Sequence, residues 1–170
     1  MKRKLLSDFT LLTIVLSIAA PMWAGGSCKN PGTPAANTAL VKRFYAAFNT
    51  KNKIILDTTL TSDWIDIPLA AGQKPGREGM KGIMDVYWAS FPDLNVMNED
   101  FVIQGNKVAV RSTVHATHKG DFATVKASGK PIAILAIDIH EICDGRIIKT
   151  WHAEDWLSGL IQMGGLPIAK

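Results

Sequence analysis

The chain has 170 residues, of which 47% are hydrophobic, 20% charged and 8% aromatic. These values are typical of a single folded domain, and they exclude disordered, collagen-like and small disulfide-rich proteins. The formal net charge is only +4, and no run of lysine and arginine with interleaved aromatic residues follows residue 4. We therefore expect no binding to nucleic acid.

The first 24 residues have the pattern of a secretory signal peptide. Three basic residues at 2–4 precede an apolar run at 9–20 and small residues at 24–26. We expect cleavage after Ala24 and export to the periplasm or the extracellular space. The apolar run is too short to cross about 30 Å of hydrocarbon as a helix, so the sequence does not favour a permanent membrane span.

Residues 25–37 are rich in Gly, Pro and Asn and are predicted to be a flexible linker before a domain at 38–166. The chain has two cysteines, Cys28 in this linker and Cys143 near the end of a predicted strand. They could pair in an oxidising compartment, but the expected mobility of the linker favours Cys143 as a small buried apolar residue. Lipid attachment at Cys28 is a weaker alternative, because residues 25–27 lack the leucine-led tripeptide that such processing requires.

The first half of the domain is predicted to be helical. Apolar residues recur at helical spacing in three segments, and the last of these is closed by Pro92. A short segment at 63–67 that ends at Pro68 and a Gly/Pro-containing loop separate the second segment from the third. The predicted helices are at 38–50, 53–60 and 80–91.

Beyond residue 94 the period of the apolar residues changes to two, which indicates β-strands. Gly105-Asn106 and Asp144-Gly145 are typical of hairpin turns. Helices followed by antiparallel hairpins predict an α+β fold in which a curved sheet packs one face against the helices. The predicted strands are at 96–104, 107–118, 131–143 and 146–155, and a short helix is predicted at 156–163.

The last hairpin predicts which side chains share a face. A two-residue turn at Asp144-Gly145 pairs Cys143 with Arg146, which would place Asp138 opposite Trp151. Because side chains alternate along a strand, Asp138 and Trp151 would then share one face, with His152 on the other.

Asp138 is unusual because it interrupts an apolar strand, in the sequence Ala-Ile-Asp-Ile. Burial penalises an ionised carboxyl group and raises its pKa unless a donor compensates. Asp138 is therefore the first candidate for acid/base chemistry. The alternative is a structural carboxylate held by a donor such as Trp151 or Lys149.

Three further segments of the chain are informative together: GREGMKGIMDVYWASFPDLNV (76–96), EDFVIQGNKVAVRSTVHATHKGDF (99–122) and AIDIHEICDGRIIKTWHAEDW (136–156). They resemble the SnoaL-like polyketide cyclases, also labelled ester cyclases, which have the nuclear-transport-factor-2-like fold. The resemblance implies a cone-shaped, curved antiparallel sheet wrapped around three N-terminal helices, with a short C-terminal helix. It also implies acid/base catalysis without metal or cofactor, and a homodimer formed through the outer face of the sheet.

The resemblance also assigns residues to the site. Asp138 matches the family's catalytic aspartate, and His118, in Ala-Thr-His-Lys-Gly, matches its catalytic histidine. Trp151 and Asp155 match the family's Trp-x-x-x-Asp ending and are candidate substrate-binding residues. Two further aromatic residues are candidates for the pocket wall, although such residues are more often part of a core. They are Trp64 and Trp88.

Two functions follow from these expectations. The first is a cofactor-independent cyclase or isomerase, in which Asp138 removes a proton next to a carbonyl of a small hydrophobic molecule while His118 or Trp151 donates a hydrogen bond to the developing enolate oxygen. The second is an exported, non-catalytic module that binds a hydrophobic ligand in the same cone. The four scattered histidines lack the spacing of a zinc site, so we expect no metal.

Overall fold

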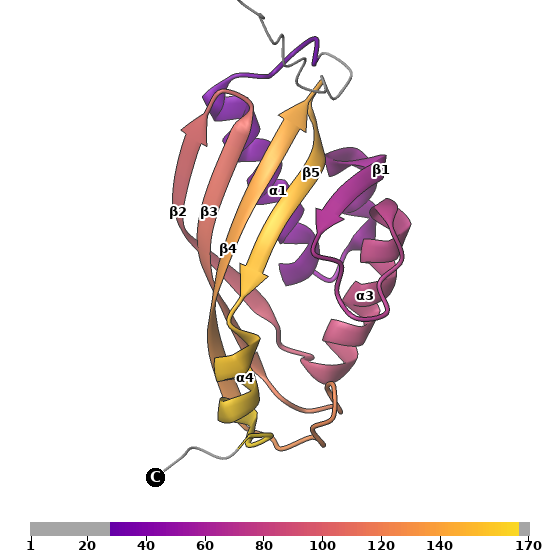
Figure 1. Ribbon diagram of the computed structural model, residues 1–170, viewed down its shortest axis with the longest axis vertical. Helices are drawn as coiled ribbons and strands as arrows, with labels where there is room; N and C mark the ends of the chain where they lie inside the picture. Colours follow the sequence, from indigo (N-terminus) through magenta and orange to yellow (C-terminus); the bar gives the residue numbers. More distant parts are fainter. Residues whose placement is uncertain (1–27, 167–170) are drawn as a thin grey trace, which may run out of the picture.

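The computed structural model describes residues 28–166, which form an α+β fold built on one curved sheet (Figure 1). The predicted signal peptide, its cleavage site and residues 25–27 of the predicted linker lie outside the described residues. Within residues 28–166, no helix combines the length and the apolar character needed to cross a membrane.

The sheet contains five strands in the order β1-β5-β4-β3-β2 and does not close into a barrel (Figure 1). Strands β2 to β5 are antiparallel neighbours, whereas β1 pairs with β5 in parallel. The four predicted strands are confirmed, and the segment before Pro68 is a fifth strand. The strands are β1 (Leu60–Ile67), β2 (Asn95–Gln104), β3 (Lys107–Thr117), β4 (Pro131–Cys143) and β5 (Arg146–Glu154).

The predicted helices are also present, but the first begins earlier than expected. The side chain of Thr33 accepts a hydrogen bond from the Ala36 amide, and Pro34 occupies the first turn, where its missing N–H costs nothing. The linker prediction is therefore wrong for residues 34–37, which are helical. The helices are α1 (Pro34–Asn49), the 3-10 helix η1 (Lys53–Ile55), α2 (Leu56–Thr59), α3 (Gly76–Ser90) and α4 (Trp156–Met163).

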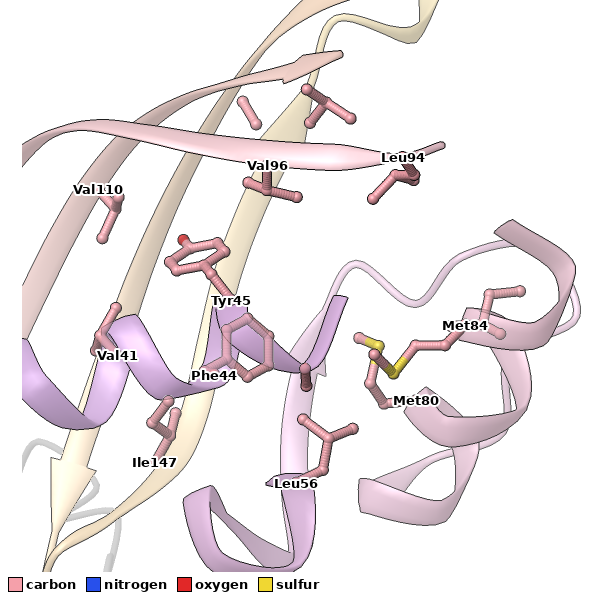
Figure 2. Close-up of a cluster of buried hydrophobic side chains, with 14 of the residues drawn as sticks. Val41, Phe44, Tyr45, Leu56, Met80, Met84, Leu94, Val96, Val110 and Ile147 are labelled. Carbon is pink, nitrogen blue, oxygen red and sulfur yellow. The ribbon is translucent and has the colours of Figure 1, made fainter. Parts of the chain in front are cut away.

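The core lies between the inner face of the sheet and helices α1 and α3 (Figure 2). Val41, Phe44 and Tyr45 of α1 are buried there, together with Met80 and Met84 of α3. Along β4, alternate residues are buried, as a strand with one covered face requires. This alternation carries two polar residues, Asp138 and His140, into the apolar interior.

The β4–β5 hairpin starts in the predicted register and then shifts. Cys143 pairs with Arg146, but a bulge follows, so that Asp138 lies opposite His152 and Ile139 opposite Trp151. A bulge adds one residue to one strand and moves every later side chain to the other face. The prediction that Asp138 faces Trp151 is therefore wrong, as is the assignment of His152 to the opposite face.

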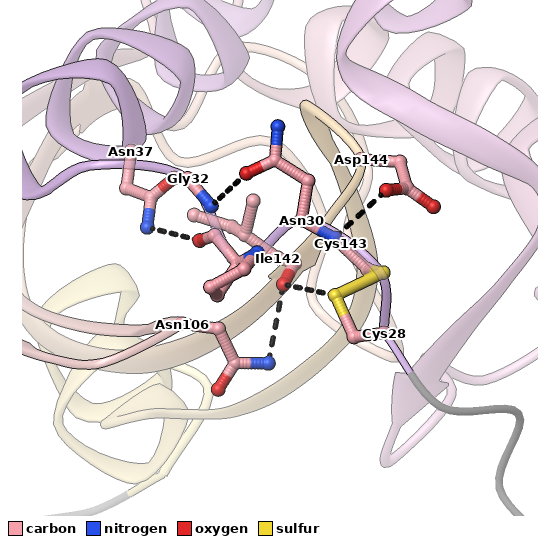
Figure 3. Close-up of a disulfide and its surroundings, with 9 residues drawn as sticks. Cys28, Asn30, Gly32, Asn37, Asn106, Ile142, Cys143 and Asp144 are labelled. Atoms are coloured by element: carbon pink, nitrogen blue, oxygen red, sulfur yellow. Dashed lines mark hydrogen bonds between the residues drawn. A yellow bond between two sulfur atoms is a disulfide. The ribbon is translucent and has the colours of Figure 1, made fainter.

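The N-terminal segment is tied to the tip of this hairpin by a disulfide bond between Cys28 and Cys143 (Figure 3). The amide of Asp144 donates to the Asn30 carbonyl (2.9 Å), and the Asn30 amide donates to Oδ1 of Asp144 (3.1 Å). These bonds hold the segment beside the turn, and the two cysteine Cα atoms lie 5.5 Å apart. The preference for an unpaired Cys143 was wrong because residues 28–33 pack on the hairpin.

Candidate functional site

Asp138 lies in the middle of β4 on its inner face and is only 8% exposed. Helix α1 crosses this face, and the Tyr45 hydroxyl donates a 2.7 Å hydrogen bond to Oδ2 of Asp138. Oδ1 makes no hydrogen bond to the described residues, and Asp138 lines two adjoining hollows of the interior. One carboxyl oxygen is thus held in place while the other is free for a ligand.

Tyr45 is itself the last donor of a hydrogen-bonded chain through the core. Trp64 Nε1 can only donate, and it does so to the Thr150 hydroxyl (3.1 Å). The Thr150 proton is then directed to Nδ1 of His140 (3.0 Å), which leaves Nε2–H of His140 to donate to the Tyr45 oxygen (3.0 Å). All protons point toward Asp138, so the polar chain favours a negative charge on this carboxyl group.

The environment sets the protonation of each member of the chain. Burial raises the pKa of Asp138 to about 6, although the Tyr45 hydrogen bond opposes the shift. Burial lowers the pKa of His140 to about 3, which keeps the ring neutral. Burial, together with the charge of Asp138, raises the pKa of Tyr45 well above its usual value. Of these three hydrogen-bonded residues, Asp138 is thus the one with a pKa close to neutral pH.

A second, charged cluster lies next to Asp138 on β5. His152 Nδ1 is 2.8 Å from Oε1 of Glu154, and Nε2 is 2.8 Å from the Pro68 carbonyl and 3.1 Å from Oδ1 of Asp66. Because both nitrogens face acceptors, the ring carries two protons. Burial alone would lower the pKa of His152, but Asp66 and Glu154 outweigh it and raise the pKa to about 11. His152 is therefore an imidazolium between two carboxylates.

Asp138, His152 and Glu154 are also the described residues that best resemble a metal-binding set. Their ligand atoms lie within 4.8 Å of one another. A histidine ligand must offer a nitrogen lone pair, whereas both nitrogens of His152 face acceptors and carry protons. The arrangement fits an ion cluster better than a metal centre.

Three adjoining hollows lead from Asp138 to the surface. The two inner ones have volumes of about 80 Å³ each, and the outer one has about 370 Å³. Tyr87 and Glu154 line all three. Leu69 and Val86, which are 41% and 49% exposed, line the outer hollow. A mostly apolar hollow with a few polar groups at its inner end is typical of a small-molecule site.

The structure brings together only two of the six predicted site residues. Asp138 and Trp64 both line an inner hollow. His118 is fully buried, but it lies after the end of β3, eight residues beyond Val110, the β3 partner of Asp138. Eight residues correspond to about 26 Å of strand. His118 Nδ1 instead contacts the Ser128 hydroxyl at 3.1 Å and fixes the base of the loop at 118–130.

The other three predicted residues lie away from these hollows. The Trp151 ring is on the outer face of the sheet, with Nζ of Lys107 4.7 Å and Nζ of Lys149 5.0 Å from its centroid. Trp88 donates to the Phe48 carbonyl (3.2 Å). The third of these residues is Asp155, whose carboxylate caps α4 by accepting a hydrogen bond from the Ser158 amide at 3.0 Å.

Sequence reasoning did not select Tyr45, Tyr87, His152 or Glu154 as site residues. The two tyrosines belong to the apolar stripes of their helices, so their periodicity indicates only a buried position. The predicted register puts His152 on the wrong face, and with it Glu154 two residues later, because no residue in β5 marks the bulge. The one available signal was Asp138 itself, since a buried carboxyl group requires a donor from elsewhere in the fold.

Comparison with known proteins places this arrangement in a family. The SnoaL-like polyketide cyclase model matches residues 39–163. TsrD from Streptomyces laurentii is 27% identical, with a TM-score of 0.74, and the match covers 79% of this chain and 99% of TsrD. A candidate polyketide cyclase from Bacillus cereus is 30% identical, with a TM-score of 0.69 and coverage of 78% and 83%.

A third solved structure, the candidate polyketide cyclase IdmH from Streptomyces antibioticus, is 29% identical, with a TM-score of 0.68 and coverage of 75% and 98%. A search of curated proteins gave no match. The family match covers most of the chain, and the five-stranded sheet with its helices agrees with the nuclear-transport-factor-2-like fold of these structures. The chain belongs to the SnoaL-like polyketide cyclase family.

Proposed function

We propose that this protein is a cofactor-independent acid/base enzyme of the cyclase or isomerase type, acting on a small hydrophobic carbonyl compound. Asp138 is its general base. The observation that carries this proposal is the free Oδ1 of a buried carboxyl group at the inner end of a mostly apolar hollow. The names of IdmH and the Bacillus cereus protein, both candidate polyketide cyclases, support it.

The protonation state of Asp138 suits this chemistry. With its pKa raised to about 6, the carboxyl group is ionised at neutral pH and is a stronger base than an ordinary aspartate. It takes a proton from the carbon next to the carbonyl, the C–H electron pair forms a C=C bond, and the carbonyl π pair moves onto oxygen. Asp138 then returns the proton to another atom. Tyr45 holds the second carboxyl oxygen throughout.

We also propose that the mature protein is exported and forms a homodimer. The disulfide bond between Cys28 and Cys143 supports an oxidising compartment. The outer face of β4 exposes Leu135, Ile137 and Ile139 by 39–48%, a run of apolar side chains that a second copy of the chain would cover.

A non-catalytic binding module is the second candidate function. The observation that favours it is the difference in size between the hollows. The outer hollow has a volume of about 370 Å³, whereas the two inner hollows next to Asp138 have about 80 Å³ each. A ligand that fits the outer hollow would thus be too large for either inner one as it stands. In that case the ligand would bind at the mouth without reaching the carboxylate.

The test is deuterium exchange from D₂O into 2-tetralone, an aromatic ketone with acidic C–H bonds, followed by mass spectrometry. We expect the wild-type protein to accelerate the exchange and Asp138→Asn to lower that acceleration at least a hundredfold. The matched control is Asp63→Asn, because Asp63 is exposed and its carboxylate makes no hydrogen bond to the described residues.

Equal rates for Asp138→Asn and the wild type would overturn the role of Asp138. An absence of exchange in the wild-type protein, combined with saturable binding of 2-tetralone, would establish the binding module instead.

A further inference from the structure

We propose that Tyr87 donates the hydrogen bond that holds the substrate's carbonyl oxygen opposite Asp138. This inference deepens the proposed function and rests on it. It assigns the role that the sequence analysis gave to His118 or Trp151, neither of which lines the hollows that reach Asp138.

The donors around Asp138 are almost all engaged. The indole N–H of Trp64 donates to Thr150, and the hydroxyl of Tyr45 donates to Asp138 itself. Both N–H groups of His152 donate to acceptors of the charged cluster. If one of these groups donated to a ligand instead, its present acceptor would be left buried without a hydrogen bond. The free-energy cost of that unsatisfied acceptor opposes such a change of partner.

Tyr87 differs from these groups. It lies on α3, across the hollow from the sheet, and lines all three hollows, including both that Asp138 lines. Its hydroxyl makes no hydrogen bond to the described residues. Its ring stacks on Trp156 with an interplanar angle of 11° and a centroid distance of 6.0 Å, which restricts its orientation. Tyr87 therefore has a ring of restricted orientation and a hydroxyl without a hydrogen-bond partner among the described residues, and it lines the same hollows as Asp138.

The surrounding charges keep Tyr87 in the donor form. Burial, followed by the negative charges of Glu154 and Asp66, raises the pKa of Tyr87 above its usual value. The hydroxyl thus stays protonated throughout the pH range in which Asp138 becomes ionised. Excess negative charge from these carboxylates also means that a neutral ketone or ester fits the hollow better than an anionic one.

Two other groups near the hollow have a free N–H. Gln73 lines only one inner hollow, and its amide is held at both ends, by the Ala70 amide and by Asp66. Trp156 lines one inner hollow and the outer one. Tyr87 is favoured over both because, of the three residues, it alone lines every hollow.

In the proposed step, Asp138 Oδ1 takes the α-proton, the C–H pair becomes the C=C bond, and the negative charge that develops on the carbonyl oxygen is stabilised by the Tyr87 O–H. No bond to Tyr87 forms or breaks, and its proton remains on the phenol. A donor aimed at a developing oxyanion stabilises the transition state more than the ground state. Removing the hydroxyl should therefore lower kcat more than it raises KM.

The first test measures binding and requires no turnover. 2-Naphthol is an aromatic enol that mimics the enolate, and naphthalene is the same ring system without the oxygen. Fluorescence titration should show that the wild-type protein prefers 2-naphthol, and that Tyr87→Phe lowers this preference by about tenfold while naphthalene binds as before. Trp156→Phe is the control, because it removes the free indole N–H of Trp156 and keeps an aromatic ring.

The second test uses the chain's only other tyrosine. Tyr45→Phe removes a hydrogen bond that lowers the pKa of Asp138, so the pH midpoint of 2-tetralone exchange should move up. Tyr87→Phe should lower kcat by about tenfold or more with the midpoint unchanged.

The inference is overturned if Tyr87→Phe leaves both the naphthol preference and kcat unchanged, if the wild-type protein shows no preference for 2-naphthol, or if Trp156→Phe removes the preference instead. Failure of the proposed function has a different signature. Exchange would then persist in Asp138→Asn, whatever Tyr87→Phe does to naphthol binding.

Discussion

His140 and His152 are the same residue type on the same face of the same hairpin, yet His140 is neutral and His152 is positively charged. His140 is sealed in the core between a tyrosine and a threonine hydroxyl, and burial lowers its pKa to about 3. His152 is partly exposed at the inner end of the hollow, where two carboxylates overcome the burial effect and raise its pKa to about 11.

This difference explains why Asp138 is suited to acid/base work. On one side a neutral hydrogen-bonded chain orients the carboxyl group without supplying a full charge. On the other side the positive His152 is largely neutralised by its own carboxylate partners, and the nearby Glu154 raises the pKa of Asp138. Neither neighbour stabilises the carboxylate as a direct salt bridge would, so its pKa stays raised.

The largest expected effect comes from removing the charge of His152. His152→Gln would leave Asp66 and Glu154 without a cation and should lower the free energy of unfolding by about 4 kcal/mol at pH 6. Because the folded pKa of about 11 exceeds the unfolded value, this contribution is complete below about pH 6.5 and is lost as the pH rises through 11. Urea unfolding at pH 6 and pH 10 measures it.

The control for this variant is His115→Gln, because His115 is exposed on β3 and its side chain makes no hydrogen bond to the described residues. An equal loss for both variants, or a loss that grows with pH, would contradict the charged state of His152.

A smaller effect of opposite sign is expected from neutralising Asp138. The folded pKa of about 6 lies above the ordinary aspartate pKa of 3.8, so the wild-type protein loses stability as the pH rises from about 4 to about 6. The difference is about two pH units, or about 3 kcal/mol. The Asp138→Asn variant does not lose this stability, because an asparagine side chain does not ionise, and its amide oxygen can still accept the Tyr45 hydrogen bond.

Asp138→Asn should thus be more stable than the wild type at pH 8 and equal to it near pH 4, as thermal melts at the two pH values would show. A variant that is less stable at pH 8 would mean that Asp138 is a structural carboxylate, which is the alternative that its sequence context left open.

The smallest expected effect comes from breaking the neutral chain. Thr150→Val would leave both the Trp64 N–H and the His140 Nδ1 without a partner, and should cost about 2 kcal/mol of unfolding free energy. Because His140 stays neutral, the difference from the wild type should be the same at pH 5 and pH 9. Thr61→Val is the control, since the Thr61 hydroxyl makes no hydrogen bond to the described residues. A pH-dependent difference would place a charge in the chain.

Much of the fold could be predicted because its signals are local. The period-two pattern and the Asp144-Gly145 turn located β4 and β5, and the strand ends at Pro131 and Cys143 agree with the prediction. The inward position of Asp138 also followed from the pattern, because Ile134, Ala136 and Ile142 on the same face of β4 are apolar.

The site could be predicted only in part because its contacts join distant segments. Tyr45 and Asp138 are 93 residues apart, and the bond between them depends on how α1 crosses the sheet. The bulge after Glu141 in the hairpin pairing has no local signal, yet it turns Trp151 outward and His152 inward. A displacement of one residue was enough to change the predicted partner of Asp138.

The sequence by itself thus determined the order of helices and strands and the inward-facing carboxyl group, since periodicity and turn chemistry act within a few residues. Only the tertiary structure decided what surrounds that group: the neutral chain behind Asp138, the imidazolium beside it, the free hydroxyl of Tyr87 across the hollow, and the disulfide at the hairpin tip. These depend on where packing places elements that are remote along the chain, and a protonation state is set by the groups that packing brings together.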